Sequence, residues 1–254
     1  MTLDEKIGQM VQFGRIKPKE KELVRQGRIG SFLNSRNVEL VNEVQRIAME
    51  ESRLKIPLLI GSDIIHGYVT TFPIPLAEAC SWNLDLIEDS ARHAMTEAAS
   101  EGVRWNFAPM VDIARDPRWG RVAEGAGEDP YLGSLIAKAR VKGFQAKGED
   151  GFPIAAACAK HYVAYGGVEG GRDYNTVDVS EHVLRTTYLP PFKACVEAGV
   201  MTFMSSFNDI MAVPASANDF TLRQILKDEW RFDGFVVSDW ESVEEVIGHG
   251  IADD

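Results

Sequence analysis

The chain has 254 residues, of which 45% are hydrophobic and 26% are charged, so it is long enough to bury a substantial core. Its 38 acidic residues outnumber the 27 lysines and arginines, and the resulting formal charge of −11 argues against nucleic acid as a partner. No apolar run approaches the roughly 20 residues that a membrane-spanning helix needs, so a membrane is not expected as a partner either.

Short apolar or β-branched runs alternate along the chain with longer segments of helical periodicity. The predicted strands are 30–34, 56–63, 103–112, 154–162, 200–208 and 235–239. The predicted helices are 38–48, 84–98, 131–146, 181–198 and 221–230, where apolar residues recur at helical spacing. Thr221 and Gln224 fit a capping box, so the last helix is expected to begin at Thr221.

The alternation of strands and helices predicts a parallel α/β fold, either a doubly wound sheet or a (β/α)8 barrel of the TIM type. The glycine fingerprint of a dinucleotide-binding sheet is absent, because the nearest approach to it, 125–130, ends in proline. The barrel is therefore favoured. Because six predicted strands do not close eight, we expect the barrel to be truncated after about six βα units.

Three cysteines, Cys80, Cys158 and Cys195, are present without C-x-x-C spacing. An odd number of cysteines argues against a disulfide framework, and the spacing argues against a zinc site. Each lies in an alanine-rich apolar stretch, so all three are expected to be small, buried core residues.

Polar residues stand at the carboxyl ends of five of the predicted strands. They are Asp63, Asp112, the pair Lys160 and His161, the pair Asn208 and Asp209, and the pair Ser238 and Asp239. Ligands of parallel βα folds bind at the carboxyl ends of the strands, so these side chains are candidates for one site. Any single one could instead cap a helix or face solvent. Lys160 and His161 fit that alternative least well, because they follow a buried run.

The loop 113–130 is rich in charge and contains Trp119 and the arginines at 115, 118 and 121. Such a loop could be a solvated network of surface charges. An indole and forked guanidinium donors also suit a polyhydroxylated ring, and Trp240 stands beside Asp239. An aromatic residue next to a carboxylate at a barrel rim is typical of a sugar site.

Five motifs make the sequence similar to a known family. They are IPLLIGSDIIHG at 56–67, DPRWGR at 116–121, GEDPY at 127–131, AKHY at 159–162 and GFVVSDW at 234–240. In this order they resemble the N-terminal domain of glycoside hydrolase family 3, closest to its periplasmic β-glucosidase branch. The resemblance covers essentially the whole chain.

The resemblance implies a retaining mechanism in which Asp239 is the nucleophile. It also places Asp63, Arg121, Lys160 and His161 among the sugar-binding residues. Further pocket residues under the same resemblance are Arg172, Met204, Phe207 and Trp240. Phe207 stands where many relatives have tyrosine. The loop 163–173 lacks the acid/base histidine of the hexosaminidase branch, so the glucosidase branch is the better match.

The function that the resemblance implies is exo-acting hydrolysis of terminal β-D-glucosyl residues from a β-glucoside or oligosaccharide, with no metal or cofactor. Residues 1–254 would form the barrel domain, incomplete at its C-terminus. The acid/base would belong to a downstream α/β sandwich domain, so the fragment alone is expected to be inactive. A periplasmic or extracellular location is implied, although residues 1–6 lack the pattern of a secretory leader. A Schiff-base aldolase that uses Lys160 and a non-catalytic sugar-binding remnant remain as alternatives.

Overall fold

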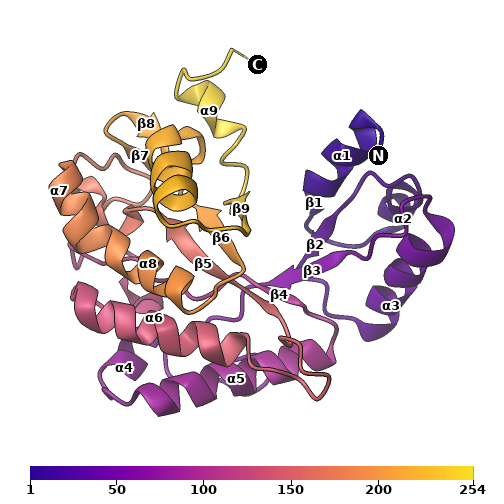
Figure 1. Cartoon of the computed structure of the whole chain (residues 1–254), viewed down its shortest axis with the longest axis horizontal. Coiled ribbons are helices and arrows are strands. Elements are labelled where there is room, and N and C mark those ends of the chain that lie inside the picture. The colour runs from indigo at the N-terminus through magenta and orange to yellow at the C-terminus, as the bar shows by residue number, and fades with distance from the viewer. Residues whose placement is uncertain (254) are drawn as a thin grey trace.

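Seven parallel strands form one curled sheet in the computed structural model, which describes residues 1–253 (Figure 1). In spatial order they are β1 (Gln12–Phe13), β2 (Ser31–Leu33), β3 (Leu59–Ser62), β4 (Trp105–Asn106), β5 (Ala156–Tyr162), β6 (Thr202–Ser205) and β9 (Phe235–Ser238). Neighbours in the sheet are neighbours along the chain, without the reversal that a doubly wound sheet has at its switch point. The architecture is therefore an open portion of a (β/α) barrel, as the sequence predicts.

The strands differ from the predicted ones in number and length. Strand β1 was missed because two residues carry no detectable period. The predicted strand 103–112 is reduced to β4, although the chain continues alongside β5: Lys160 N donates to Pro109 O at 3.0 Å and Val111 N to Lys160 O at 2.8 Å. Proline has no N–H, so Pro109 interrupts the regular ladder. A hairpin of β7 (Asp209–Ile210) and β8 (Val213–Pro214) after β6 was not expected.

Helices flank the sheet in the order expected of βα units. The longer ones are α1 (Leu3–Met10), α2 (Pro18–Arg25), α3 (Val38–Arg46), α5 (Leu84–Ser100), α6 (Pro130–Phe144), α8 (Leu189–Glu197) and the helical segment Phe220–Glu229. The short helices are α4 (Pro75–Ala79), α7 (Glu181–Val183) and α9 (Glu245–Gly248). Helices α5, α6 and α8 pack side by side (Figure 1). All five predicted helices are present, whereas α1, α2, α4 and α9 were not predicted.

The capping box predicted at Thr221 is wrong. The helical segment already includes Phe220, and Thr221 N donates to the side chain of Asn218 at 3.1 Å. The Thr221 hydroxyl donates to the Asn218 carbonyl at 3.3 Å. A capping box does occur in the chain, at Thr2 and Glu5, where it begins α1.

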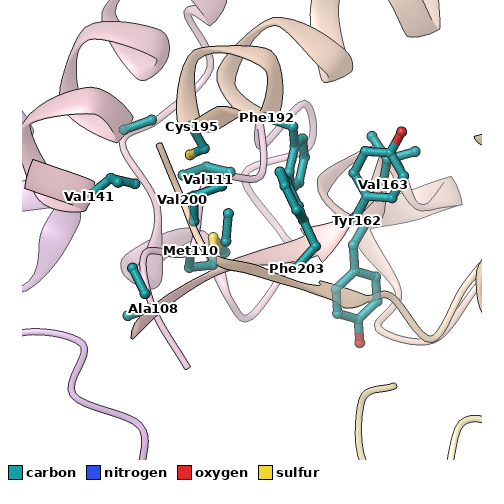
Figure 2. Packing of buried hydrophobic residues seen from close by; sticks show 14 of the residues in the cluster. Ala108, Met110, Val111, Val141, Tyr162, Val163, Phe192, Cys195, Val200 and Phe203 are labelled. Carbon is teal, nitrogen blue, oxygen red and sulfur yellow. The ribbon is translucent and has the colours of Figure 1, made fainter. Parts of the chain in front are cut away.

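The main hydrophobic core lies between β5, β6 and the helices that cover them (Figure 2). Tyr162 at the end of β5 packs edge to face against two phenylalanines. Its ring centroid lies 5.3 Å from that of Phe192 and 5.5 Å from that of Phe203. The Tyr162 hydroxyl donates to the Thr221 carbonyl at 2.8 Å, so its buried polar atom is satisfied. This packing fixes the position of β5, which carries Lys160 and His161.

Helix α6 approaches α5 unusually closely at Gly143. A Cβ atom at Gly143 would lie 2.3 Å from the Glu88 carbonyl oxygen and 2.7 Å from the Ala91 Cβ. Only glycine allows this contact between the two helices.

The two edges of the sheet are β1 and β9, and no strand among residues 1–253 pairs with their outer sides. Phe235 on β9 is accordingly 47% exposed. None of the helices in residues 1–253 is both long and apolar enough to cross a membrane.

The cysteines are free, as expected, but one of them is not a core residue. Cys158 and Cys195 are buried, and burial raises the pKa of Cys158 to about 12. Cys80 is exposed, because it follows the last residue of the short helix α4, at its solvent-facing end. The expectation of three buried thiols is therefore wrong for Cys80.

A buried ion pair joins α4 to α6. The Arg140 guanidinium bonds to the Glu78 carboxylate, and both side chains are less than 10% exposed. Arg140 also donates to the Ile65 carbonyl at 2.9 Å. The pair therefore ties the loop after β3 to the helix layer.

We predict that Arg140→Met lowers the free energy of unfolding by about 3–5 kcal/mol, because the Glu78 carboxylate is then buried without a counterion. Urea denaturation measures this, with Arg92→Met at an exposed ion pair as the matched control. The double variant with Glu78→Leu should recover most of the loss. Equal losses for Arg140→Met and Arg92→Met would contradict the prediction.

Candidate active site

A cavity of about 400 Å³ opens at the carboxyl ends of the strands, between the two edges of the sheet. Its wall joins residues from both ends of the chain: Met10, Gln12, Gly14, Leu33, Asp63, Phe107, Arg121, Lys160, His161, Met204, Val237, Ser238, Asp239, Trp240 and Glu241. Gly14 and Trp240 are neighbours, since a Cβ at Gly14 would lie 3.6 Å from the indole ring. The curl of the sheet therefore brings the segment after β1 against the segment after β9.

Lys160 and Asp63 form an ion pair inside this cavity. Lys160 is near the end of β5, and Asp63 directly follows β3. Their Nζ and Oδ1 atoms are 2.6 Å apart. The Lys160 side chain is 4% exposed, whereas that of Asp63 is 42% exposed. Asp63 thus presents a free carboxylate oxygen to a ligand while its other oxygen neutralises the buried ammonium.

His161 is buried beside Lys160, and Asp112 contacts it on the side away from the cavity. Asp112 Oδ2 lies 2.9 Å from the backbone N of His161 and 2.9 Å from its ring Nδ1. Burial lowers the pKa of His161 well below its usual value, and the nearby cations Arg121 and Lys160 lower it further. The imidazole is therefore neutral at pH 7, with Nε2 directed toward Asp239 at 3.5 Å from its Oδ2.

Asp239 directly follows β9 and has one satisfied and one unsatisfied oxygen. Its Oδ1 accepts from Trp240 N at 2.7 Å, and its Oδ2 is buried without a hydrogen-bond partner among the described residues. The 3.5 Å separation from His161 Nε2 is too long for a well-formed bond. Burial raises the pKa of Asp239, while the Trp240 N–H, Lys160 and Arg121 oppose that rise.

Arg121 reaches the same cavity from the loop after β4. Its Nε lies 2.7 Å from Glu124 Oε1 and its guanidinium lies over the Tyr165 ring, 5.6 Å from the centroid. Glu124 and Tyr165 thus hold the guanidinium plane in place. The Tyr165 ring also meets the His161 ring edge-on at 5.3 Å.

The structure brings together seven of the nine residues proposed from the sequence: Asp63, Arg121, Lys160, His161, Met204, Asp239 and Trp240 line the cavity. Arg172 is exposed and lies outside this lining set. Phe207 is buried against Tyr174, with the ring centroids 4.5 Å apart, and it too lies outside the lining set.

Two further expectations from the sequence are wrong. Trp119 cannot stack on a ligand, because it is 2% exposed and its Nε1 donates to Asp173 at 2.9 Å. Asp209 does not stand at the rim, because β6 ends at Ser205 and Asp209 belongs to the hairpin with β8. The apolar run that suggested a longer strand includes the loop before the hairpin.

Several residues of the site were not identified from sequence. Met10, Gln12 and Gly14 come from α1, β1 and the residue after β1, and a two-residue strand gives no periodic signal. Glu124 was counted only as one charge of a charged loop. Its spacing of three residues from Arg121 could have suggested the ion pair, which forms across a single helical turn.

The neutral state of His161 predicts a pH dependence of stability. The pKa of His161 in the folded state lies below the unfolded value of 6.5. Burying the neutral imidazole therefore costs nothing extra above about pH 6.5, and the folded state loses stability as the pH falls below that value. Between about pH 6 and pH 5 the wild type should lose about 1 kcal/mol per pH unit relative to His161→Gln. Chemical denaturation at several pH values measures the difference. The exposed His182, changed to Gln, should leave the slope as it is, and a His161→Gln slope parallel to wild type would refute the prediction.

Comparison with known proteins places this arrangement in a family. The family model described as the glycosyl hydrolase family 3 N terminal domain matches residues 2–254. The periplasmic beta-glucosidase of Salmonella typhimurium is 43% identical over 100% of this chain, which covers 34% of that protein. The lysosomal beta glucosidase of Dictyostelium discoideum is 32% identical over 97% of this chain, which covers 35% of it.

Comparison with solved structures gives the same family. The beta-glucosidase from Listeria innocua in complex with glucose superimposes with a TM-score of 0.92 and 40% identity, covering 100% of this chain and 38% of that one. The chain thus spans about a third of the length of the relatives it matches. The chain belongs to glycoside hydrolase family 3, whose N-terminal domain it matches over essentially its whole length.

Proposed function

We propose that the chain forms the nucleophile-bearing barrel domain of a retaining β-glucosidase, with Asp239 as the nucleophile. The observation that carries the proposal is the position of the Asp239 carboxylate, which shares one cavity with Asp63, Arg121, Lys160 and His161. Retention of configuration needs a carboxylate that attacks the anomeric carbon, and sugar hydroxyls need charged and neutral hydrogen-bonding groups around it.

Asp63, Arg121, Lys160 and His161 bind the sugar in this proposal. Asp63 accepts hydrogen bonds from hydroxyl groups, whereas Lys160 and Arg121 donate to them. Met204 forms an apolar wall, and Trp240, which is 60% exposed, provides an aromatic face at the mouth. Arg172 and Phe207 would contribute only if their loops moved toward the bound sugar.

The acid that protonates the leaving oxygen would come from outside this chain, from the α/β sandwich domain that the family resemblance implies. Asp63 is unsuited to that role because its Oδ1 already bonds to the Lys160 ammonium at 2.6 Å. In this proposal residues 1–254 are one domain of a longer enzyme. A terminal β-D-glucosyl residue of a small glycoside or oligosaccharide is the proposed substrate, and the periplasm or the extracellular space is the proposed location.

A Schiff-base aldolase is the less suitable alternative. Its lysine must attack as a free amine, which requires a depressed pKa. Lys160 Nζ is instead 2.6 Å from Asp63 Oδ1, so the nitrogen is engaged in an ion pair rather than free to attack. Borohydride should therefore trap no carbonyl substrate on Lys160.

Covalent labelling tests the nucleophile. A 2-deoxy-2-fluoro β-glucoside with a good leaving group should glycosylate Asp239, since fluorine destabilises the cation-like transition states of both steps. Such a leaving group departs without protonation, so labelling does not depend on the acid/base residue. Peptide mass mapping locates the label. Labelling of Asp63, or a product of inverted configuration in the NMR spectrum, would contradict the assignment.

Kinetics of the complete enzyme test the binding role of Lys160. Lys160→Ala should lower kcat/KM by roughly 10- to 100-fold, the range expected for a lost charge-assisted hydrogen bond. The acidic limb should move to higher pH, because the Lys160 charge no longer lowers the pKa of Asp239, while the basic limb should stay in place. Lys138→Ala, at an exposed ion pair with Glu197, is the matched control and should have little effect. A Lys160→Ala profile that lost its basic limb would instead assign Lys160 to proton transfer.

A further inference from the structure

Asp112 lies outside the cavity and reaches it only through His161. Its side chain is fully buried, and its Oδ2 lies 2.9 Å from His161 Nδ1. On the other side of the imidazole, Nε2 lies 3.5 Å from Asp239 Oδ2. One ring thus separates two buried carboxyl groups, and its hydrogen position decides how both of them are satisfied.

The two carboxyl groups compete for a single hydrogen. A neutral imidazole carries one N–H, on either Nδ1 or Nε2. Both Asp112 Oδ1 and Asp239 Oδ2 are buried and have no hydrogen-bond partner among the described residues. A doubly protonated ring would serve both sides, but burial and the facing cations of Arg121 and Lys160 disfavour it.

If Nδ1 carried the hydrogen, two unfavourable contacts would remain. The lone pair of Nε2 would face the Asp239 carboxylate, and Asp112 would be an anion whose Oδ1 has no donor in a dry interior. If Asp112 keeps its own proton, Oδ2 donates to Nδ1 and still accepts from the backbone N–H of His161. Nε2–H then points to Asp239, and both buried contacts become attractive.

The surroundings of Asp112 favour the arrangement in which Asp112 keeps its proton and Nε2 of His161 carries the hydrogen. Burial raises the pKa of Asp112 to about 7, and Glu124 also raises it. The His161 N–H, Arg121 and Lys160 oppose this rise without cancelling it. The uncharged Tyr165 ring also lies against the imidazole, and Asp63 pairs with the neighbouring Lys160.

We propose that Asp112 is a positioning residue: as a neutral carboxyl group it donates to His161 Nδ1, which sets the Nε2–H tautomer and directs that N–H at the Asp239 carboxylate. A donor there would keep Asp239 ionised despite its burial. The statement about the tautomer does not depend on the proposed function, whereas its consequence for catalysis rests on it.

Nitrogen-15 NMR of the protein with labelled histidine tests the tautomer directly. His161→Gln assigns the signal among the five histidines. At about pH 6, below the pKa of Asp112, the wild type should show hydrogen on Nε2. Hydrogen on Nδ1 or on both ring nitrogens would overturn the proposal. The wild-type spectrum decides this point even if no variant at position 112 folds.

Asp112→Asn is designed to reverse the tautomer. The backbone N–H of His161 needs an acceptor, so the amide oxygen must take the place of Oδ2. That oxygen cannot donate to Nδ1, and the ring should therefore change to the Nδ1–H form. Asp116→Asn, which removes a carboxylate at an exposed ion pair with Arg118, should leave the His161 spectrum as in wild type. An unchanged tautomer in Asp112→Asn would contradict the proposal.

Kinetics of the complete enzyme show whether the tautomer matters for Asp239. Asp112→Asn should lower kcat/KM by about 10- to 100-fold and move its acidic limb to higher pH, because Asp239 then faces a lone pair instead of a donor. A merely structural defect would lower activity without moving the limb. Because the spectra require no turnover, a failed covalent label with the expected tautomer would refute the proposed function and leave this inference standing.

Discussion

The end of β5 places two basic side chains, Lys160 and His161, in the interior of the protein, and the rest of the site is arranged around them. An ammonium that is 4% exposed needs a counterion, and Asp63 at the end of β3 provides it. The imidazole beside it needs a partner for Nδ1, and Asp112 in the segment after β4 provides that one. Three adjacent strands are thus connected at their carboxyl ends by electrostatics as well as by the backbone ladder.

The curl of the open sheet determines which segments line the cavity. Strands β1 and β9 are its edges, and the residues that follow them, Gly14 and Trp240, meet across the opening. Asp239 therefore stands between the last strand and the Lys160–His161 pair, and its buried Oδ2 has no hydrogen-bond partner within residues 1–253. In our account, a sugar bound in the cavity would be held by the β3–β5 side and attacked from the β9 side.

The fold class and several residues of the site could be predicted from local sequence. Alternating strand and helix patterns indicated a parallel fold. The rule that ligands bind at strand ends singled out Asp63, Lys160, His161 and Asp239, which do share one cavity, but it also singled out Asp112, Asn208 and Asp209, which do not line that cavity. Met204 required the family resemblance, because nothing in its neighbourhood distinguishes it from other core residues. The resemblance was also needed to choose Arg121 among the three arginines of its loop.

The errors have physical causes that local patterns do not contain. Trp119 was expected to stack on a ligand, but it is buried in the core and its indole N–H donates to Asp173. Strand β1 is too short for a period, and Asp209 belongs to a hairpin whose two strands are each only two residues long. The role that we assign to Asp112 depends on two unsatisfied oxygens on opposite sides of one ring, which only coordinates reveal.

Chemical rescue tests most directly the claim that Asp239 attacks the sugar while Asp63 binds it. Asp239→Gly should be inactive on an activated aryl β-glucoside and should recover turnover when azide is added. Azide would occupy the space left by the carboxylate and attack once, so the product should be the α-glucosyl azide. If Asp63→Gly were rescued in this way and Asp239→Gly were not, the two carboxylates would have the opposite roles and the account of the site would be wrong.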